Sequence, residues 1–527
     1  MPPPLSLGLS DFKKLREQGF YYVDKSLFIT EVLRRNAEVL LLPRPRRFGK
    51  TLNLSMLRYF FEQTESDTAR LFDGLAVADD AETMRHQGCY PVIYLTFKDC
   101  KAATAEEAFR KIGALFADLY QEYEASLSPS LTAREQPRYQ RLAVNGADTV
   151  EWQSALAFLM HLLHRHTGQP VVVLIDEYDT PIHSAHEYGY YDEMVLFMRS
   201  LLGKALKDNT DLARCVITGI LRIAKESIFS DLNNLLVCSL LRSEFQDCFG
   251  FTEAEVERLI ADFGEADGET IKTWYNGYRF GQITIYNPWS VLNFLASADR
   301  MAIPYWINTG GNALLRRLLT RTDLRFQTHI ETLLAGGVVT TTVNENAVLR
   351  DLEANDVNIW SLLLFSGYLK PIKAEQQVVR WLYDLTIPNL EIYAFYETIL
   401  QEWIRQRAGS RIDDLLHALL QADWHSFGKL LRDTVVAVLS YHDTAGDEPE
   451  RIYHAFVLGL LTHLNDRYHI RSNRESGYGR YDVMMIPRNP ALPGFIFEFK
   501  KVDYPDDKDA QAAMVSALRQ IRERDYA

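Results

Sequence analysis

The stretch "LLPRPRRFGKTLN", residues 41–53, decides the fold of the N-terminal part of this 527-residue chain. Gly49, Lys50 and Thr51 match the end of the phosphate-binding pattern G-x-x-x-x-G-K-[ST]. Arg44 stands where that pattern has its first glycine. A glycine-lysine-threonine triplet also occurs by chance. The neighbouring sequence has to decide whether the first glycine is missing, as in a chance match, or replaced by Arg44 in a true phosphate-binding loop.

The neighbouring sequence has the order strand, loop, helix. Residues 37–42, "AEVLLL", form an apolar run of strand length, and residues 50–63 carry apolar side chains at helical spacing. The N–H groups and the dipole at a helix start favour an anion. Lys50 can then reach the β- and γ-phosphates of a nucleotide, Thr51 can ligate Mg²⁺, and Gly49 permits close approach of the backbone.

A second motif supports this interpretation. Residues 170–181, "PVVVLIDEYDTP", form an apolar run that ends in carboxylates, as expected of a buried parallel strand that opens onto a ligand crevice. Asp176 is placed to hold the shell of Mg²⁺, and Glu177 to polarise the attacking water. The bland alternative is a strand that ends in a polar turn.

Two further apolar runs complete the pattern. Residues 90–97 and 213–220 read as buried strands, and the second ends in Thr218, which is placed to sense the γ-phosphate. The alternation of strands and helices over residues 37–245 predicts an α/β domain with a largely parallel sheet.

Composition sets limits on the function. The chain is 47% hydrophobic and 12% aromatic, enough for two to four globular domains, and its formal charge of −13 argues against a protein coated with nucleic acid. A local basic channel stays open, because Arg44, Arg46 and Arg47 cluster in the loop, although a charge run is usually a solvated face.

Cysteine usage and the apolar runs indicate the compartment. The five cysteines contain no C-x-x-C pair, which fits reduced thiols. The sequence shows neither a cleavable leader pattern nor an apolar run near the roughly 18 residues that span a bilayer. We therefore expect a cytoplasmic protein without a membrane partner.

The C-terminal part carries a second chemical pattern. Asp482 precedes a short apolar run, and Glu498 and Lys500 in "GFIFEFKKV", residues 494–502, are spaced as E-x-K. Residues two apart on a strand share a face. Carboxylates that hold a divalent cation, with an ammonium near the attacking water, are what phosphodiester hydrolysis needs. Such spacings are common, so the pattern alone is weak.

Nearly the whole chain resembles a known family, the bacterial AAA-ATPase-like proteins, whose members commonly carry a C-terminal nuclease-like domain of the PD-(D/E)XK type. The motifs that carry the resemblance occur in the family's order: "YYVDKSLFI" (21–29), "RPRRFGKTLNLSML" (44–57), "LIDEYDTPI" (174–182), "ITGILRIAKESIFSDLNNL" (217–235), "WYNGYRFG" (274–281) and "YNPWSVLNFL" (286–295).

The resemblance has implications for both sites. In that family an arginine also replaces the first glycine of the loop, so Arg44 is a family trait. Together with the motifs above, this predicts an ATP site made of Arg44, Arg47, Gly49, Lys50, Thr51, Asp176 and Thr218, with Mg²⁺ or Mn²⁺ as the metal. The resemblance also implies a nuclease constellation of Glu450, Asp482, Glu498 and Lys500, followed by a helix with Gln520, beyond which we expect the family's domain to continue for a few more elements.

Three modules are expected. The predicted fold is α/β: a P-loop NTPase domain over residues 1–245, a helical lid with a candidate winged helix over 246–390, and a restriction-endonuclease-like domain with a helical linker over 391–527. Thr252 and Glu255 have the spacing of a helix capping box at the start of the second module.

Three classes of function follow. The first is an ATPase that gates a Mg²⁺-dependent nuclease acting on DNA or RNA, in defence against mobile DNA. The second is a regulatory NTP-binding switch whose nuclease-like domain binds nucleic acid without cutting it. The third, a pure scaffold, is disfavoured because it would not need the residues of both sites. A second copy of the chain is a further candidate partner.

Overall fold

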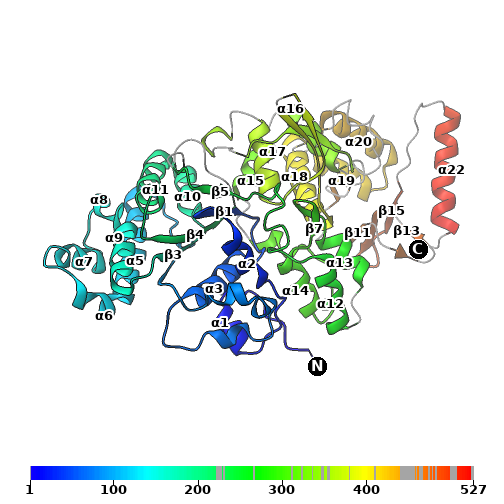
Figure 1. Ribbon diagram of the computed structural model, residues 1–527. Helices are drawn as coiled ribbons and strands as arrows, with labels where there is room; N and C mark the ends of the chain where they lie inside the picture. Colours follow the sequence, from blue (N-terminus) through cyan, green and yellow to red (C-terminus); the bar gives the residue numbers. More distant parts are fainter. Residues whose placement is uncertain are drawn as a thin grey trace. The chain divides into compact units, whose positions relative to one another are not determined.

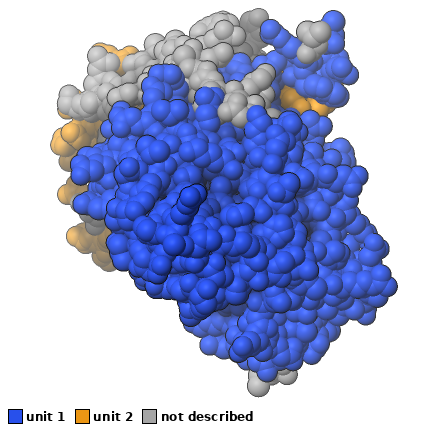
Figure 2. Space-filling view, turned by 60° about the vertical axis from the view of Figure 1, so that its left-hand side comes forward, with its two compact units in different colours: residues 1–309, 341–371, 375–382 blue, residues 310–340, 372–374, 383–527 orange. Residues whose placement is uncertain are grey.

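The computed structural model describes most of the chain (Figure 1). The described residues are 2–220, 228–229, 232–264, 267–309, 313–321, 324–334, 336–345, 349–352, 356–378, 380–408, 411–438, 457, 460–461, 464, 467–472, 475–476, 479–480, 483–498 and 507–523. The chain divides into two compact units, which Figure 2 colours separately. Unit 1 comprises residues 1–309, 341–371 and 375–382, and unit 2 comprises residues 310–340, 372–374 and 383–527.

The centre of unit 1 is a five-stranded parallel sheet in the order β2-β3-β4-β1-β5. Its strands are β1 (Val39–Pro43), β2 (Val92–Thr96), β3 (Val171–Asp176), β4 (Leu212–Gly219) and β5 (Leu235–Val237). Every residue of β1 and β3 is buried, which explains why these strands are apolar runs without alternation. The predicted α/β fold with a parallel sheet is confirmed.

Strand register brings the functional motifs together. Pro43 at the end of β1 pairs with Gly219 at the end of β4, and Ile175, one residue before the end of β3, pairs with Ile217. The carboxyl ends of these three strands therefore lie at one edge of the sheet. Ligands of open α/β sheets bind at this edge.

Helices cover this sheet. Helix α3 (Lys50–Phe61) packs against β2 and β3, and α9 (Ala155–Thr167) packs against β3. The other helices before residue 210 are α1 (Phe12–Glu17), α2 (Leu27–Arg34), α4 (Ala81–Met84), α5 (Ala105–Glu122), α6 (Glu124–Leu127), α7 (Gln136–Ala143), α8 (Thr149–Trp152), α10 (Thr180–Tyr188) and α11 (Tyr191–Leu206). Short 3₁₀ turns are η1 (Ala69–Phe72), η2 (Ala76–Asp79), η3 (Ser128–Ser130), η4 (Ile307–Thr309) and η5 (Leu349–Asp351).

A helical module of unit 1 follows the sheet. It contains α12 (Glu253–Phe263), α13 (Gly268–Tyr275), the hairpin of β6 (Tyr278–Phe280) and β7 (Ile283–Ile285), and α14 (Pro288–Ala296). Its core includes Leu259, Tyr275 and Phe294. The predicted capping box is present, because the Thr252 hydroxyl accepts from the Glu255 N–H and the Glu255 carboxylate accepts from the Thr252 N–H.

The region after residue 310 is mainly helical with small sheets. Its helices are α15 (Ala313–Arg321), α16 (Leu324–Leu334), α17 (Asp356–Phe365), α18 (Leu390–Ala408), α19 (Arg411–Leu420), α20 (Trp424–Val438) and α22 (Asp507–Glu523). Strands β8 (Val339–Thr342), β9 (Lys370–Gln377) and β10 (Arg380–Thr386) form a sheet in the order β8-β10-β9. Helix α17, a turn at Gly367 and strand β9 follow one another in the region of the candidate winged helix, which itself stays a prediction.

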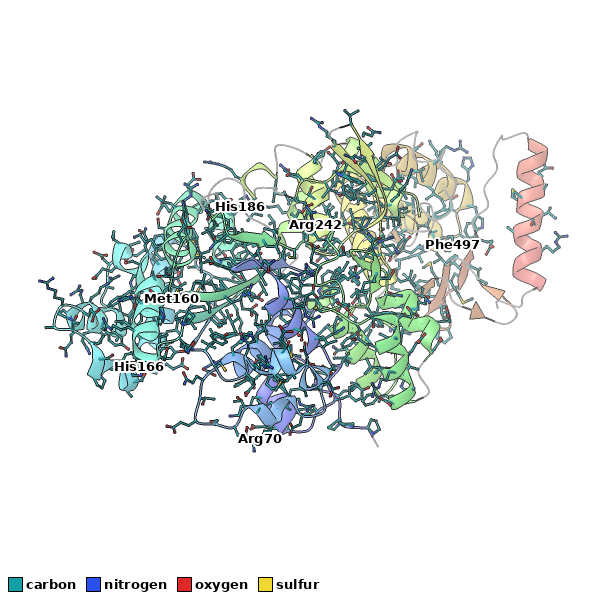
Figure 3. All side chains as sticks on the ribbon, in the orientation of Figure 1. Arg70, Met160, His166, His186, Arg242 and Phe497 are labelled. Atoms are coloured by element: carbon teal, nitrogen blue, oxygen red, sulfur yellow. The ribbon has the colours of Figure 1, made fainter. Side chains whose placement is uncertain are left out.

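Unit 2 ends in short strands and a helix. Strands β11 (Tyr468–Ser472), β14 (Val483–Pro487) and β15 (Phe495–Phe497) form an antiparallel sheet in the order β11-β14-β15. Strands β12 (Glu475–Ser476) and β13 (Gly479–Arg480) form a separate pair. Phe497, the last residue of β15, is labelled in Figure 3. Over the described part of the chain, the helices are too short or too polar to traverse a lipid bilayer.

Candidate functional site

The loop between β1 and α3 has left-handed backbone at two positions. Gly49, the N-cap of α3, has a φ of 85°, and Arg47 has a φ of 66°. Arg44 does not have a positive φ. Its N–H donates to the Gly219 carbonyl at 3.0 Å, and this bond extends the pairing of β1 with β4. The conformational freedom of glycine is therefore needed at position 49 but not at position 44. This explains how an arginine can stand in place of the first glycine.

Lys50, the first residue of α3, is held by the loop itself. Its ammonium donates to the carbonyl oxygens of Arg44 and Pro45, both at 2.9 Å. Burial lowers the pKa of Lys50, although the nearby carboxylates of Glu177 and Asp176 act in the opposite direction. The loop therefore keeps a buried ammonium in place at the helix N-terminus, where an anion is favoured.

Asp176 links three elements of the site. Its Oδ2 accepts a hydrogen bond from the Thr51 hydroxyl at 2.7 Å, and its Oδ1 accepts one from the Thr218 hydroxyl at 2.6 Å. The carboxylate is only 1% exposed, at the end of β3 between α3 and β4. Hydroxyl and carboxylate oxygens are ligands that suit Mg²⁺, so Thr51 and Asp176 fit the predicted metal.

Glu177 directly follows this strand and has an uncommon backbone conformation. Its φ is 51°, which places it in the left-handed region where residues other than glycine are rare. Its carboxylate is half-buried and accepts from the Thr180 hydroxyl at 3.2 Å. Strained backbone of this kind clusters at functional sites, which is consistent with the predicted role of Glu177.

The sequence interpretation missed Asp179. This residue is 1% exposed and lies just before α10, and its Oδ2 accepts from the N–H of Ile220 at 2.8 Å. It thereby fixes the chain immediately after Thr218 and Gly219. The signal was visible in the motif "DEYD", in which a second aspartate follows Asp176 by three residues.

Two of the three loop arginines, Arg44 and Arg47, contact other parts of the protein. The Arg44 guanidinium, predicted to take part in ATP binding, donates to main-chain carbonyl oxygens, among them that of Cys238 at 2.6 Å. The guanidinium of Arg47 lies over the indole of Trp289, 4.3 Å from the ring centroid. Direct phosphate binding by either side chain stays a prediction.

The predicted nuclease constellation is only partly described. Glu450, Asp482 and Lys500 lie outside the described residues, as does the side chain of Gln520 in α22. Glu498 directly follows β15 and is half-buried. Phe497 pairs with Val483 in the antiparallel sheet, and these two residues are the sequence neighbours of Glu498 and Asp482.

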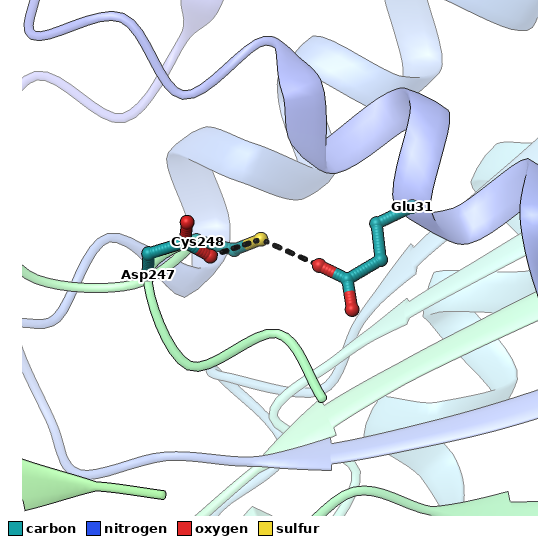
Figure 4. A group of neighbouring side chains, drawn as sticks. All are labelled: Glu31, Asp247 and Cys248. Atoms are coloured by element: carbon teal, nitrogen blue, oxygen red, sulfur yellow. Dashed lines mark hydrogen bonds between the residues drawn. The ribbon is translucent and has the colours of Figure 1, made fainter. Parts of the chain in front are cut away.

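One other cluster has the donor types of a metal site (Figure 4). Glu31, Asp247 and Cys248 place one ligand atom each within 4.8 Å of one another. Burial raises the pKa of the Cys248 thiol well above its usual value, so the thiol stays protonated and donates to Glu31 at 3.3 Å. This trio therefore acts as a hydrogen-bonded anchor between α2 and the segment after β5.

Comparison with known proteins agrees with the geometry of the sheet edge. Residues 6–229 match the family model described as "Predicted AAA-ATPase", and residues 448–527 match the PD-(D/E)XK nuclease superfamily. The chain carries an AAA-ATPase-like domain and a nuclease-like domain. A protein of Azotobacter chroococcum mcd 1, described as an uncharacterized protein in the vnfD 5' region, is 28% identical over 99% of this chain and 93% of its own length.

Proposed function

We propose that the AAA-ATPase-like domain binds ATP with Mg²⁺ or Mn²⁺ and hydrolyses it, and that this cycle gates a metal-dependent nuclease acting on DNA or RNA in the cytoplasm. Defence against mobile DNA is the role that such a gated nuclease would serve. The observation that supports the proposal best is the Asp176 carboxylate, which joins the hydroxyls of Thr51 and Thr218 beside the Lys50 loop.

Each residue of this edge has a distinct task. Lys50 compensates the charge of the β- and γ-phosphates from the helix N-terminus. Thr51 and Asp176 would hold the metal ion, which supplies charge neutralisation on the phosphates when bound. Glu177 orients and polarises the attacking water. Thr218, in β4, senses the γ-phosphate beside Asp176, to which its hydroxyl is hydrogen-bonded.

The nuclease-like domain contributes a second metal site in this proposal. Glu498, Asp482 and Glu450 supply carboxylate oxygens, which suit Mg²⁺ or Mn²⁺. Lys500 holds the attacking water or lowers its pKa. The half-buried position of Glu498 at the end of β15 supports this role, since a carboxylate there is partly withdrawn from solvent.

The test uses the full chain. Nucleotide binding is measured by calorimetry, phosphate release is followed with Mg²⁺ or with a chelator, and labelled single- and double-stranded DNA and RNA are incubated with and without ATP. We expect Mg²⁺-dependent phosphate release and ATP-dependent cleavage of one of these substrates. Lack of ATP binding by the wild-type protein would contradict the first half of the proposal, and binding of nucleic acid without cleavage would contradict the second.

A further inference from the structure

The side chain of Arg44 is fully buried beside the nucleotide-binding loop. Its exposed fraction is 0%, and its Nη1 donates to the carbonyl oxygens of Pro43 at 2.8 Å and Cys238 at 2.6 Å. Its Nη2 lies 3.3 Å from the carbonyl oxygens of Glu244 and of Phe245. Three of these four acceptors are 194 to 201 residues away in sequence.

Two aromatic rings complete this environment. The guanidinium carbon lies 5.2 Å from the ring centroid of Phe249 and 5.2 Å from that of Phe280. Burial lowers the pKa of Arg44 to about 10, so the side chain remains charged at neutral pH. A planar guanidinium offers five N–H donors in a fixed fork and stacks on aromatic faces. This combination of carbonyl acceptors and rings fits an arginine and no smaller side chain.

Most of the acceptors belong to one segment, residues 238–250, which we name the strap. Arg242, labelled in Figure 3, lies within it. The strap makes two further hydrogen bonds near this site. Asn53 Nδ2 in α3 donates to the Cys248 carbonyl at 2.8 Å, and the Gly250 N–H donates to the carbonyl of Phe48 in the loop at 3.2 Å.

The strap is itself anchored to α2. Glu31 accepts from the Phe245 N–H at 2.9 Å and from the Cys248 thiol (Figure 4). Phe245 has a φ of 56°, a conformation that is unfavourable for a residue other than glycine and persists only where its surroundings fix it. Glu31 fixes its N–H and Arg44 lies against its carbonyl, so the strap is a defined support.

Arg44 connects this support to Lys50. Its side chain is bound to the strap, while its own carbonyl oxygen accepts from the Lys50 ammonium at 2.9 Å. A change at the guanidinium would therefore move the backbone acceptor that orients Lys50. The position of the Lys50 ammonium is thus linked, through the main chain of Arg44, to the bonds between the guanidinium and the strap.

We propose that Arg44 is a positioning residue for ATP binding: it replaces the first loop glycine by a buried guanidinium that clamps the loop to the strap and so orients Lys50. This inference rests on the proposed binding of ATP. It assigns Arg44 a role through Lys50 and the loop backbone, without contact to the nucleotide.

The test is chemical rescue of Arg44→Gly, which restores the generic motif and leaves a guanidinium-shaped gap. We expect Arg44→Gly to bind ATP about tenfold more weakly or worse, because the contacts of a charged group are lost. Millimolar guanidinium chloride should restore affinity in this variant and leave the wild type unchanged. Urea, which has a similar shape but no charge, is the control and should restore little.

A matched variant separates positioning from general stability. Arg214 on β4 also donates to main-chain carbonyls, those of Arg35, Ala37 and Leu33, and burial lowers its pKa. It pairs with the amino-terminal half of β3, at Val172, so it lies away from the nucleotide-binding edge. Arg214→Met should lower the melting temperature while ATP affinity stays within about twofold of wild type.

The ATP affinities of these variants either support or overturn the positioning role of Arg44. Arg44→Lys, which keeps the charge without the fork, is the second variant if Arg44→Gly does not fold, and we expect it to bind ATP more weakly than wild type without rescue. Wild-type affinity in Arg44→Gly or Arg44→Lys would overturn the positioning role, as would an equal loss in Arg214→Met. Failure of the wild type to bind ATP would instead overturn the proposed function.

Discussion

At the scale of single residues, the site is organised around a carboxylate that serves two hydroxyls at once. Asp176 accepts from Thr51 and Thr218, while Lys50 is bound by loop carbonyls and Glu177 by Thr180. Hydrogen bonds of this kind preorganise side chains before a ligand arrives. Single substitutions of these residues should therefore affect ATP binding and ATP hydrolysis differently.

Lys50 and Glu177 test this separation. Lys50→Ala should abolish ATP binding, because it removes the ammonium held at the start of α3. Glu177→Gln should bind ATP with unchanged affinity and release phosphate at least about a hundredfold more slowly, as expected for loss of a group that polarises water. Calorimetry measures the first effect and phosphate release the second. Unchanged affinity in Lys50→Ala would remove this loop from the binding site.

The pH dependence of ATP affinity follows from the burial of Lys50. Burial lowers its pKa below the usual 10.5, and only the protonated ammonium attracts phosphate. In the free protein the charge is lost as the pH rises through this lowered pKa, so ATP affinity should begin to fall at a pH below 10.5. Calorimetric titrations over a pH series measure this. Lys50→Arg is the control, and its affinity should hold to higher pH, whereas identical profiles would contradict the assignment.

At the scale of elements, the end of β4 is tightly packed against the motif that follows β3. A Cβ placed on Gly219 would lie 2.7 Å from a ring carbon of Tyr178 and 2.8 Å from Oδ1 of Asp179. Gly219→Ala should therefore destabilise the fold by about 1–3 kcal/mol and weaken ATP binding, because Thr218 is adjacent. Urea unfolding and calorimetry measure both effects.

Gly203 is the matched control within the same domain. It lies inside α11, and a Cβ there would have nothing within 4 Å. Gly203→Ala should stabilise the fold by about 0.5–1 kcal/mol, since alanine is the better helix former, and leave ATP affinity unchanged. If Gly219→Ala were as stable as Gly203→Ala, the close packing at the end of β4 would not limit this position.

The sequence predicted the elements that carry strong local patterns. Strands β1, β2, β3 and β4 were predicted because each is a buried apolar run, and α12 because its capping box is local. Strand β5 has only three residues and escaped prediction. The strap and its bonds to Arg44 could not be predicted, because acceptors on main-chain carbonyls leave no residue pattern.

At the scale of the whole molecule, the residues of the two candidate sites belong to different units. The loop, Asp176 and Thr218 lie in unit 1, and Glu498 lies in unit 2. The sequence predicted this division of chemistry through two motifs and a family resemblance, and the two matched domains agree with it. The sequence could not show how nucleotide binding at one site would affect cleavage at the other, because such coupling depends on contacts that no local pattern encodes.

This division allows the two activities to be removed one at a time. Glu498→Ala should lose metal-dependent cleavage of nucleic acid while ATP affinity stays within about twofold of wild type, because the substitution lies outside the unit that holds Lys50. Lys50→Ala should lose ATP binding and, if the cycle gates the nuclease, the ATP dependence of cleavage as well. Calorimetry and gel assays on the same preparations measure both.

A control within unit 2 makes the cleavage result specific. Burial raises the pKa of Glu397 in α18 to about 7, so glutamine mimics the carboxyl group in its protonated form. If activity in Glu498→Ala is lost because the metal site is lost, Glu397→Gln should cleave nucleic acid like wild type. If removal of any half-buried carboxylate were enough, Glu397→Gln would lose cleavage as well. Cleavage that persists in the Glu498 and Asp482 double variant would show that the nuclease chemistry lies elsewhere. Loss of ATP binding in Glu498→Ala would show that the two units do not act as separate sites.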